Sequence, residues 1–175
     1  MTECSADSPN QVADGGCHQG APDSLRPNLE KPGFPAPDPS RVEAAIQVLQ
    51  ADLPTLFERD ITYDIYTPDI CFRDPVNRFK GKLSYRIIFW TLRFHGQLFF
   101  TELFFDLHKV EAAASDQIRA DWTVRGTLRL PWKTRLFFNG FSIYKLTSEG
   151  QIYEHIDTWD RPPSAILQQF LPGQL

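Results

Sequence analysis

The chain has 175 residues, the length of one ordinary domain with room for a terminal extension. Its hydrophobic content of 42% and aromatic content of 13% supply enough apolar material for a core, which excludes disorder of the whole chain. A net charge of −4, with the basic residues scattered, argues against nucleic-acid binding.

Residues 1–38 are rich in Pro, Gly, Ser, Asn and Asp and have no apolar periodicity. We therefore expect a disordered tail, 1–38, followed by one domain, 39–175. Cys4 and Cys17 lack the spacing of a zinc site, so no metal and no cofactor are expected. No apolar run approaches the ~18 residues of a membrane span. Because the N-terminus lacks the pattern of a secretory signal or a transit peptide, the expected location is the cytoplasm, or the plastid stroma in a eukaryote.

The ordered part is predicted to begin with a helix at Asp38-Pro39-Ser40, where Asp38 can cap the helix and Pro39 suits its first position. Pro54 lacks the backbone N–H that a helix interior needs, which predicts a kink or a new turn there. The apolar residues of this helix recur at helical spacing: Val42, Ile46, Leu49 and Leu53.

A short strand, 70–73, is expected to end at Asp74-Pro75, with a loop over 76–81 and a second helix over 82–94. The second helix is predicted to be largely buried, because further apolar residues widen its stripe. That stripe consists of Leu83, Ile87, Trp90 and Phe94.

The remaining chain predicts strands at 99–110, 117–130, 135–146 and 151–160. The turns are Pro131-Trp132-Lys133 and Ser148-Glu149-Gly150, and a short terminal helix is expected within 164–171. Short connections between successive strands favour an antiparallel sheet. The predicted fold class is α+β: a cone-shaped domain with N-terminal helices packed on a strongly curved antiparallel sheet of about four long strands.

Three stretches resemble the SnoaL-like, ketosteroid-isomerase-like group, also called the nuclear transport factor 2-like superfamily. They are Phe72-Arg73-Asp74-Pro75 with Gly81, Trp122–Thr127 and Gly150–Asp160. The resemblance covers nearly everything after the tail, and it implies a cone-shaped fold around a pocket.

The chain is also similar to an uncharacterised family from cyanobacteria and plastids, without an assigned reaction. The residues that carry this similarity are Tyr66, Phe72–Pro75, Asp106-Leu107-His108, Leu130-Pro131-Trp132 and Asp157–Asp160.

Asp74 is the first candidate for catalysis. The resemblance to ketosteroid isomerase implies that an Asp followed by Pro at this point acts as a general base. The alternative is that Asp74 ends the strand and caps the following turn. The first helix has no Tyr for an oxyanion hole, and Gln50 lies near that place.

Asp157 and His155 are the other candidates, on the same face of the last strand as Tyr153 and Trp159. Arg125 would pair with Asp157 inside the cavity, or it would lie on the exposed or dimer face that strand alternation favours. His155 would relay a proton, or it would be a hydrogen-bonded structural residue. The His of the cyclase Gly-Thr-His motif is replaced by Leu128, so that resemblance supplies no catalytic group.

The aromatic residues are too many for one small core, and we expect some to line an apolar cavity or a dimer interface. The candidate ligand-binding residues are Phe72, Tyr85, Trp122, Tyr153 and Trp159. The partners expected are a small hydrophobic ligand and a second copy of the chain, bound through the outer sheet face. Three functions stay open: a pocket domain with acid–base chemistry of the isomerase, cyclase or dehydratase kind, a non-catalytic binder of a pigment-like or isoprenoid molecule (a carotenoid or tetrapyrrole), and an assembly factor.

Overall fold

The computed structural model describes residues 35–129 and 134–171. Two helices and two short strands precede four long strands and a last helix. The helices are α1 (Pro39–Asp52), α2 (Lys82–Phe99) and α3 (Pro163–Gln168), with 3-10 turns η1 (Leu53–Thr55) and η2 (Tyr63–Ile65). The strands are β1 (Tyr66–Arg73), β2 (Arg78–Lys80), β3 (Phe100–Ala114), β4 (Gln117–Leu128), β5 (Arg135–Leu146) and β6 (Ile152–Trp159).

Helix α1 begins as the sequence predicts. The carboxylate of Asp38 accepts a hydrogen bond from the Ser40 backbone N–H at 2.8 Å, which satisfies one of the donors left free at a helix start. The helix ends at Asp52, and Pro54 lies in the second position of η1, where its missing N–H costs no helical bond. A kink or a new turn was expected at Pro54, and the structure shows the new turn.

The sheet has six strands in the order β2-β1-β6-β5-β4-β3 and is open at both edges. The four predicted long strands pair antiparallel, whereas β1 runs parallel to β6. Strand β2 lies within the segment that was predicted to be a loop, because three residues are too few for a visible alternation. The α+β fold class is confirmed, with a mixed sheet in which β2 is the one strand that was not predicted.

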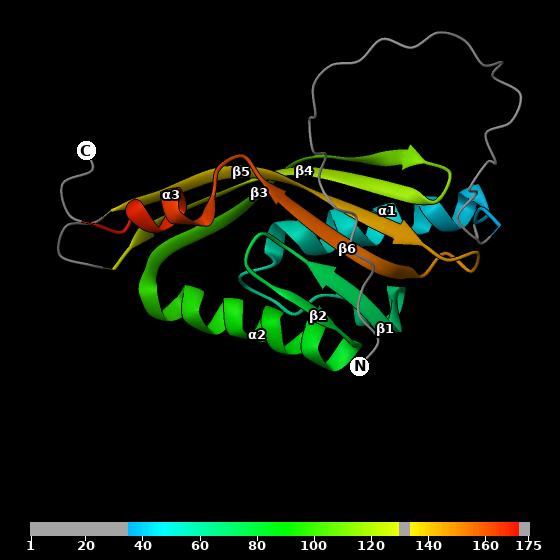
Figure 1. Ribbon diagram of the computed structural model, residues 1–175, viewed down its shortest axis with the longest axis horizontal. Helices are drawn as coiled ribbons and strands as arrows, with labels where there is room; N and C mark the ends of the chain where they lie inside the picture. Colours follow the sequence, from blue (N-terminus) through cyan, green and yellow to red (C-terminus); the bar gives the residue numbers. More distant parts are fainter. Residues whose placement is uncertain (1–34, 130–133, 172–175) are drawn as a thin grey trace, which may run out of the picture.

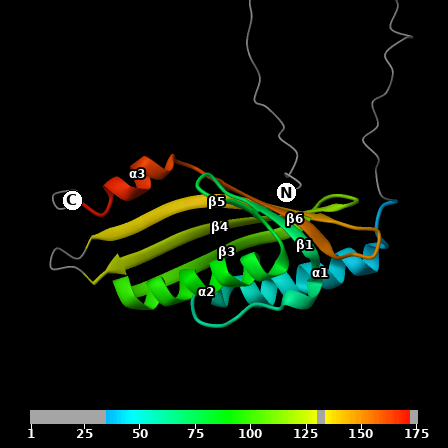
Figure 2. The same ribbon diagram turned by 60° about the horizontal axis from the view of Figure 1, so that its bottom comes forward.

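Helices α1 and α2 lie on the same side of the curved sheet, whereas α3 follows β6 and packs beside β5 on the other side (Figures 1 and 2). The core fills the space between the sheet and the first two helices. One side of β4 is buried along the strand, at Ile118, Ala120, Trp122, Val124 and Leu128. No helix in the described residues is long and apolar enough to cross a membrane.

The orientation of α2 differs from the prediction. The stripe predicted to be buried faces outward, with Leu83, Ile87, Trp90 and Phe94 all exposed. The residues that pack inward are Tyr85, Phe89 and Gly96, which form a second stripe at helical spacing. Because both stripes are apolar, helical periodicity alone does not determine which of them covers the sheet.

The predicted Pro131-Trp132-Lys133 turn, the tail residues 1–34 and the end of the chain, 172–175, lie outside the described residues.

Candidate functional site

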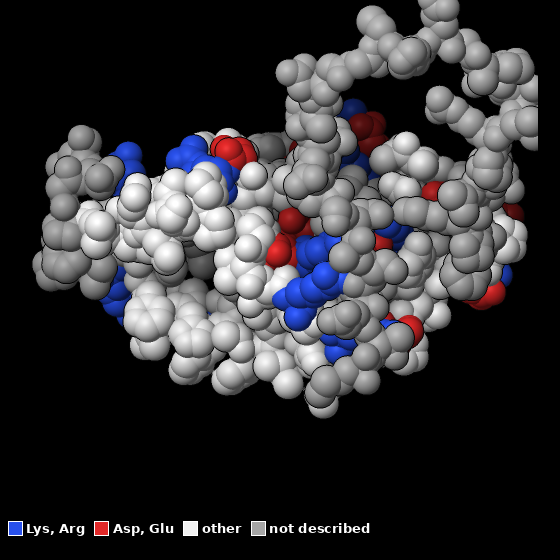
Figure 3. Space-filling model, in the orientation of Figure 1, with Lys and Arg blue, Asp and Glu red and all other residues white. Residues whose placement is uncertain are grey.

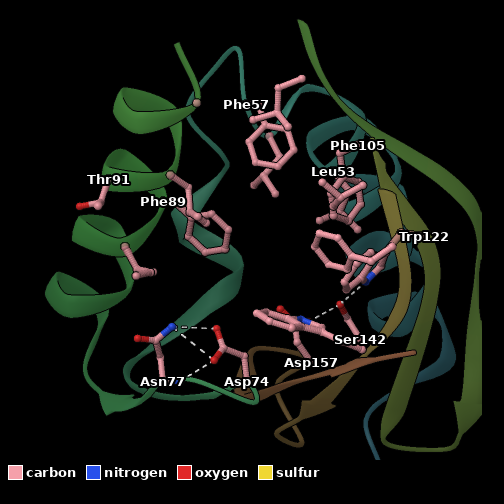
Figure 4. A pocket seen from close by; sticks show the side chains of 18 of the residues that line it. Leu53, Phe57, Asp74, Asn77, Phe89, Thr91, Phe105, Trp122, Ser142 and Asp157 are labelled. Atoms are coloured by element: carbon pink, nitrogen blue, oxygen red, sulfur yellow. Dashed lines mark hydrogen bonds between the residues drawn. The ribbon is translucent and has the colours of Figure 1, made fainter. Parts of the chain in front are cut away.

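A cavity of about 300 Å³ lies between α2, η1 and the concave face of the sheet. Its wall is almost entirely apolar. Phe57 follows η1, Phe89 comes from α2, and Phe105 and Trp122 face them from β3 and β4 (Figure 4). A void of this size within a dense core indicates a binding site, since protein interiors are otherwise close-packed.

One corner of the cavity is polar, and it is held by a chain of hydrogen bonds. Trp122 Nε1–H donates to Ser142 Oγ at 2.9 Å, and the Ser142 hydroxyl donates to Asp157 Oδ1 at 2.5 Å. His155 Nε2 lies 2.8 Å from the same Asp157 oxygen, and His155 Nδ1 lies 2.7 Å from the Tyr85 hydroxyl. Four elements, α2, β4, β5 and β6, therefore fix the position of one carboxylate.

The Tyr85 hydroxyl contacts both the His155 ring and Tyr66 in this series of hydrogen bonds. Burial raises the pKa of the Tyr85 phenol well above its ordinary value, so the hydroxyl stays protonated and can donate. When the Tyr85 O–H donates to Nδ1 of a neutral imidazole, the ring proton lies on Nε2 and is donated to Asp157. The aspartate accepts both of its hydrogen bonds from described residues on Oδ1, and Oδ2 takes none from them.

His155 is enclosed on all sides, with 3% of its surface exposed. Its ring stacks on Tyr144 at 4.3 Å between centroids and meets the edges of Phe72 and Tyr85. Both ring nitrogens are engaged with protein groups, so neither is open to a molecule in the cavity. The geometry therefore gives His155 the place of a positioning residue for Asp157.

Asp74 also lines the cavity, at the turn that joins β1 to β2. Its Oδ1 accepts from the backbone N–H groups of Val76 and Asn77 at 2.7 and 2.5 Å. Its Oδ2 accepts from the Asn77 side-chain amide at 3.0 Å (Figure 4). This is the arrangement of a turn cap, in which protein donors occupy both oxygens.

The structure brings six of the eight candidate residues to one cavity. The carboxylates of Asp74 and Asp157, the His155 ring and three aromatic rings belong to its lining: Phe72, Trp122 and Trp159. Tyr85 lies behind the wall and reaches the site through His155. Tyr153 is on the predicted strand but lies toward the β5–β6 turn and is not part of the lining.

Sequence reasoning missed Ser142 and Asn77. Ser142 is the small polar residue between Phe138 and Tyr144 on the inward face of β5, so alternation along that strand would have found it. Asn77 lies in a turn whose conformation has no periodic signal. Its contact with Asp74 becomes visible only in the structure.

Arg125 lies on the outer face of the sheet. It forms an ion pair with Asp106 on β3 and covers the ring of Phe104 at 4.3 Å. Of the two expectations for Arg125, the exposed face is the correct one, and Asp157 has no arginine beside it among the described residues. The same part of the chain holds no group of three or more His, Cys, Asp or Glu side chains placed to bind a metal ion.

The buried tyrosines predict a loss of stability at alkaline pH. Burial raises the pKa of Tyr66, Tyr85 and Tyr144 above the ordinary value of 10.0 in the folded protein. Above pH ~10 the unfolded chain releases these protons and the folded chain does not, so the free energy of unfolding falls by about 1.4 kcal/mol per pH unit for each tyrosine.

Urea denaturation at a series of pH values measures this slope. Tyr85→Phe removes one of these contributions and makes the slope shallower. A tyrosinate absorbance that appears near pH ~10 while the circular dichroism stays native would contradict the prediction.

Solved structures share this architecture. An NTF2-like protein from Anabaena variabilis has a TM-score of 0.54 at 13% identity, over 71% of this chain and 93% of the other. A putative polyketide cyclase from Xanthomonas campestris pv. campestris has a TM-score of 0.53 at 14% identity, over 74% of this chain and 97% of the other. A steroid delta-isomerase from Pseudomonas aeruginosa has a TM-score of 0.50 at 18% identity, over 77% of this chain and 89% of the other. No curated protein matches the chain.

These similarities define the class of the protein: it has the SnoaL-like, NTF2-like cone fold, as the sequence resemblance implied. Residues 43–155, more than half of the chain, match the model of a family described as Uncharacterized conserved protein (DUF2358). The chain belongs to that family.

Proposed function

We propose that the domain binds one small, mostly apolar molecule in this cavity and orients it with the carboxylate of Asp157. The observation that carries the proposal is the polar corner of an otherwise apolar cavity, in which Ser142 and His155 hold Oδ1 and leave Oδ2 open. Cavities of this composition hold apolar ligands with a few polar groups that set orientation.

The volume supports a small ligand. About 300 Å³ is at the lower end of the ~300–1,000 Å³ range of ligand pockets. A whole carotenoid or tetrapyrrole needs more room than that, so the volume favours a compact ring compound or a short isoprenoid over a pigment. An assembly factor that acts through its outer sheet would need no such void, and the cavity therefore favours a pocket function over that alternative.

Asp157 is also the better placed of the two acids for proton transfer. A general base needs an oxygen within hydrogen-bond reach of the proton that it removes. Asp157 keeps Oδ2 for this purpose, whereas the oxygens of Asp74 are both occupied by donors of its own turn. If the bound molecule carries an acidic C–H next to a carbonyl, Asp157 removes that proton, and His155 and Ser142 stabilise the carboxylate position.

Hydrogen–deuterium exchange into 2-tetralone, followed by NMR in D₂O, tests this role. Native protein is expected to accelerate exchange of the protons next to the carbonyl, and Asp157→Asn to slow it by about a hundredfold. The matched control, Asp74→Asn, should leave the rate within about twofold. If Asp74→Asn slows exchange and Asp157→Asn does not, Asp74 is the base. If native protein does not accelerate exchange, the cavity binds a ligand without this catalysis.

The second expected partner, another copy of the chain, has weaker support. The outer sheet face exposes Phe104 and Phe137, but Arg125 covers the first ring and pairs with Asp106. The homodimer stays a prediction, which light scattering can test by measuring the mass of the protein in solution. The cytoplasmic or stromal location likewise stays a prediction.

A further inference from the structure

A row of exposed apolar side chains lies on the outward face of α2. Leu83, Ile87, Trp90 and Phe94 are spaced three or four residues apart and are 72%, 55%, 59% and 49% exposed. The rings of Trp90 and Phe94 stack at 5.3 Å between centroids. Soluble domains rarely leave so many large apolar side chains in one exposed row, which indicates that something covers this face.

The charges of α2 point to the kind of surface that covers it. The helix carries Lys82, Arg86 and Arg93 and no Asp or Glu. Arg93 is neutralised by Asp60, but Lys82 and the exposed Arg86, which lies over the Tyr63 ring, have no carboxylate partner among the described residues. Arg129, also exposed, caps the C-terminal end of α2 by donating to the Gln97 carbonyl.

A second copy of the chain does not fit this pattern. Two α2 rows packed on each other would bring together the cations of both helices, with no acidic side chain on either helix to pair with them. An anionic lipid surface does fit. A helix with Trp, Phe and Leu on one face and basic residues at its margins lies in the headgroup region, with its cations toward the lipid phosphates.

The position of α2 connects this face with the cavity. Phe89, Leu92 and His95 of the same helix line the cavity, and Leu92 and His95 are also exposed. In Figure 3 the surface over α2 is largely free of charged side chains. Helix α2 therefore carries the exposed apolar row on one face and part of the cavity wall on another.

We propose that α2 docks the protein on the surface of anionic membranes through Leu83, Ile87, Trp90 and Phe94. The docking itself does not depend on the proposed function, because it concerns the outward face of α2 and not the residues of the polar corner.

Vesicle flotation with the full chain tests the docking. Vesicles of phosphatidylcholine with phosphatidylglycerol should bind the native protein, and pure phosphatidylcholine should bind it at least about tenfold less. The double variant Trp90→Ser, Phe94→Ser should lower binding to the anionic vesicles by at least about tenfold. Phe104→Ser, which removes an exposed ring from the outer sheet, is the matched control and should bind like the native protein.

A charge variant separates the electrostatic contribution to vesicle binding from the apolar contribution. Lys82→Glu, Arg86→Glu should lower binding to anionic vesicles, and about 1 M salt should have the same effect on the native protein. Three results would overturn the proposal: no binding of the native protein, equal binding by the Trp90→Ser, Phe94→Ser variant, or a native dimer that this variant dissociates while vesicles bind neither form. The last result would assign the row to a second copy of the chain.

Discussion

Replacing His155 by alanine is expected to lower the free energy of unfolding by about 3–5 kcal/mol. The substitution removes a buried ring that packs between Tyr144, Phe72 and Tyr85. It also removes the partner of the buried Tyr85 hydroxyl at Nδ1 and one hydrogen bond to Asp157, and lost buried hydrogen bonds add to the cost of the void.

Urea denaturation measures this change, with His95→Ala as the matched control. His95 is exposed on α2, and its contacts are with its own helix: the Thr91 carbonyl and the rings of Phe94 and Phe99. Its loss should therefore cost less than about 1 kcal/mol. A loss below about 1 kcal/mol for His155→Ala would show that the hydrogen-bonded chain contributes little to the fold.

Filling the cavity is expected to have a small effect on stability and a large one on binding. Val124 lies on the inward face of β4 and lines the cavity, so the void can accept the larger ring of Val124→Phe. Overpacking a filled core costs about 1–3 kcal/mol, whereas a ring that enters an existing void should change the free energy of unfolding by less than about 1 kcal/mol.

The matched control lies on the same strand. Ile118 is also β-branched and faces inward, but it is fully buried and not part of the lining. Ile118→Phe should therefore cost about 1–3 kcal/mol in the same urea experiment. Equal losses for the two variants would mean that the cavity has no room for an added ring.

Much of the fold was predictable because its elements have strong local signals. Alternation from Gln117 onward placed the buried face of β4, and the pairing of Asp38 with Pro39 marked the start of α1. The face of α2 was not predictable, since two apolar stripes run along that helix. The choice between them depends on which residues fit against β1 and β3.

Most residues of the candidate site could be predicted from the sequence, but which of its two acids is better placed to act could not. Strand parity correctly grouped His155, Asp157 and Trp159 on one face, and the fold resemblance pointed to Asp74. The ranking of the two acids depends on donors that come from other elements. The Ser142 hydroxyl on β5 donates to one oxygen of Asp157, whereas the backbone N–H groups that follow Asp74 donate to the Asp74 carboxylate. Such contacts between distant segments have no local pattern in the sequence.

The most direct test of the binding site is a calorimetric titration of the native protein, Val124→Phe and Asp157→Asn with naphthalene and 2-naphthol. The account predicts that native protein binds both, and binds the naphthol about tenfold more tightly because its hydroxyl donates to Asp157. Asp157→Asn should remove this preference, and Val124→Phe should weaken both ligands by at least about tenfold. Absence of binding to native protein, or binding that Val124→Phe leaves unchanged, would contradict the cavity as the site.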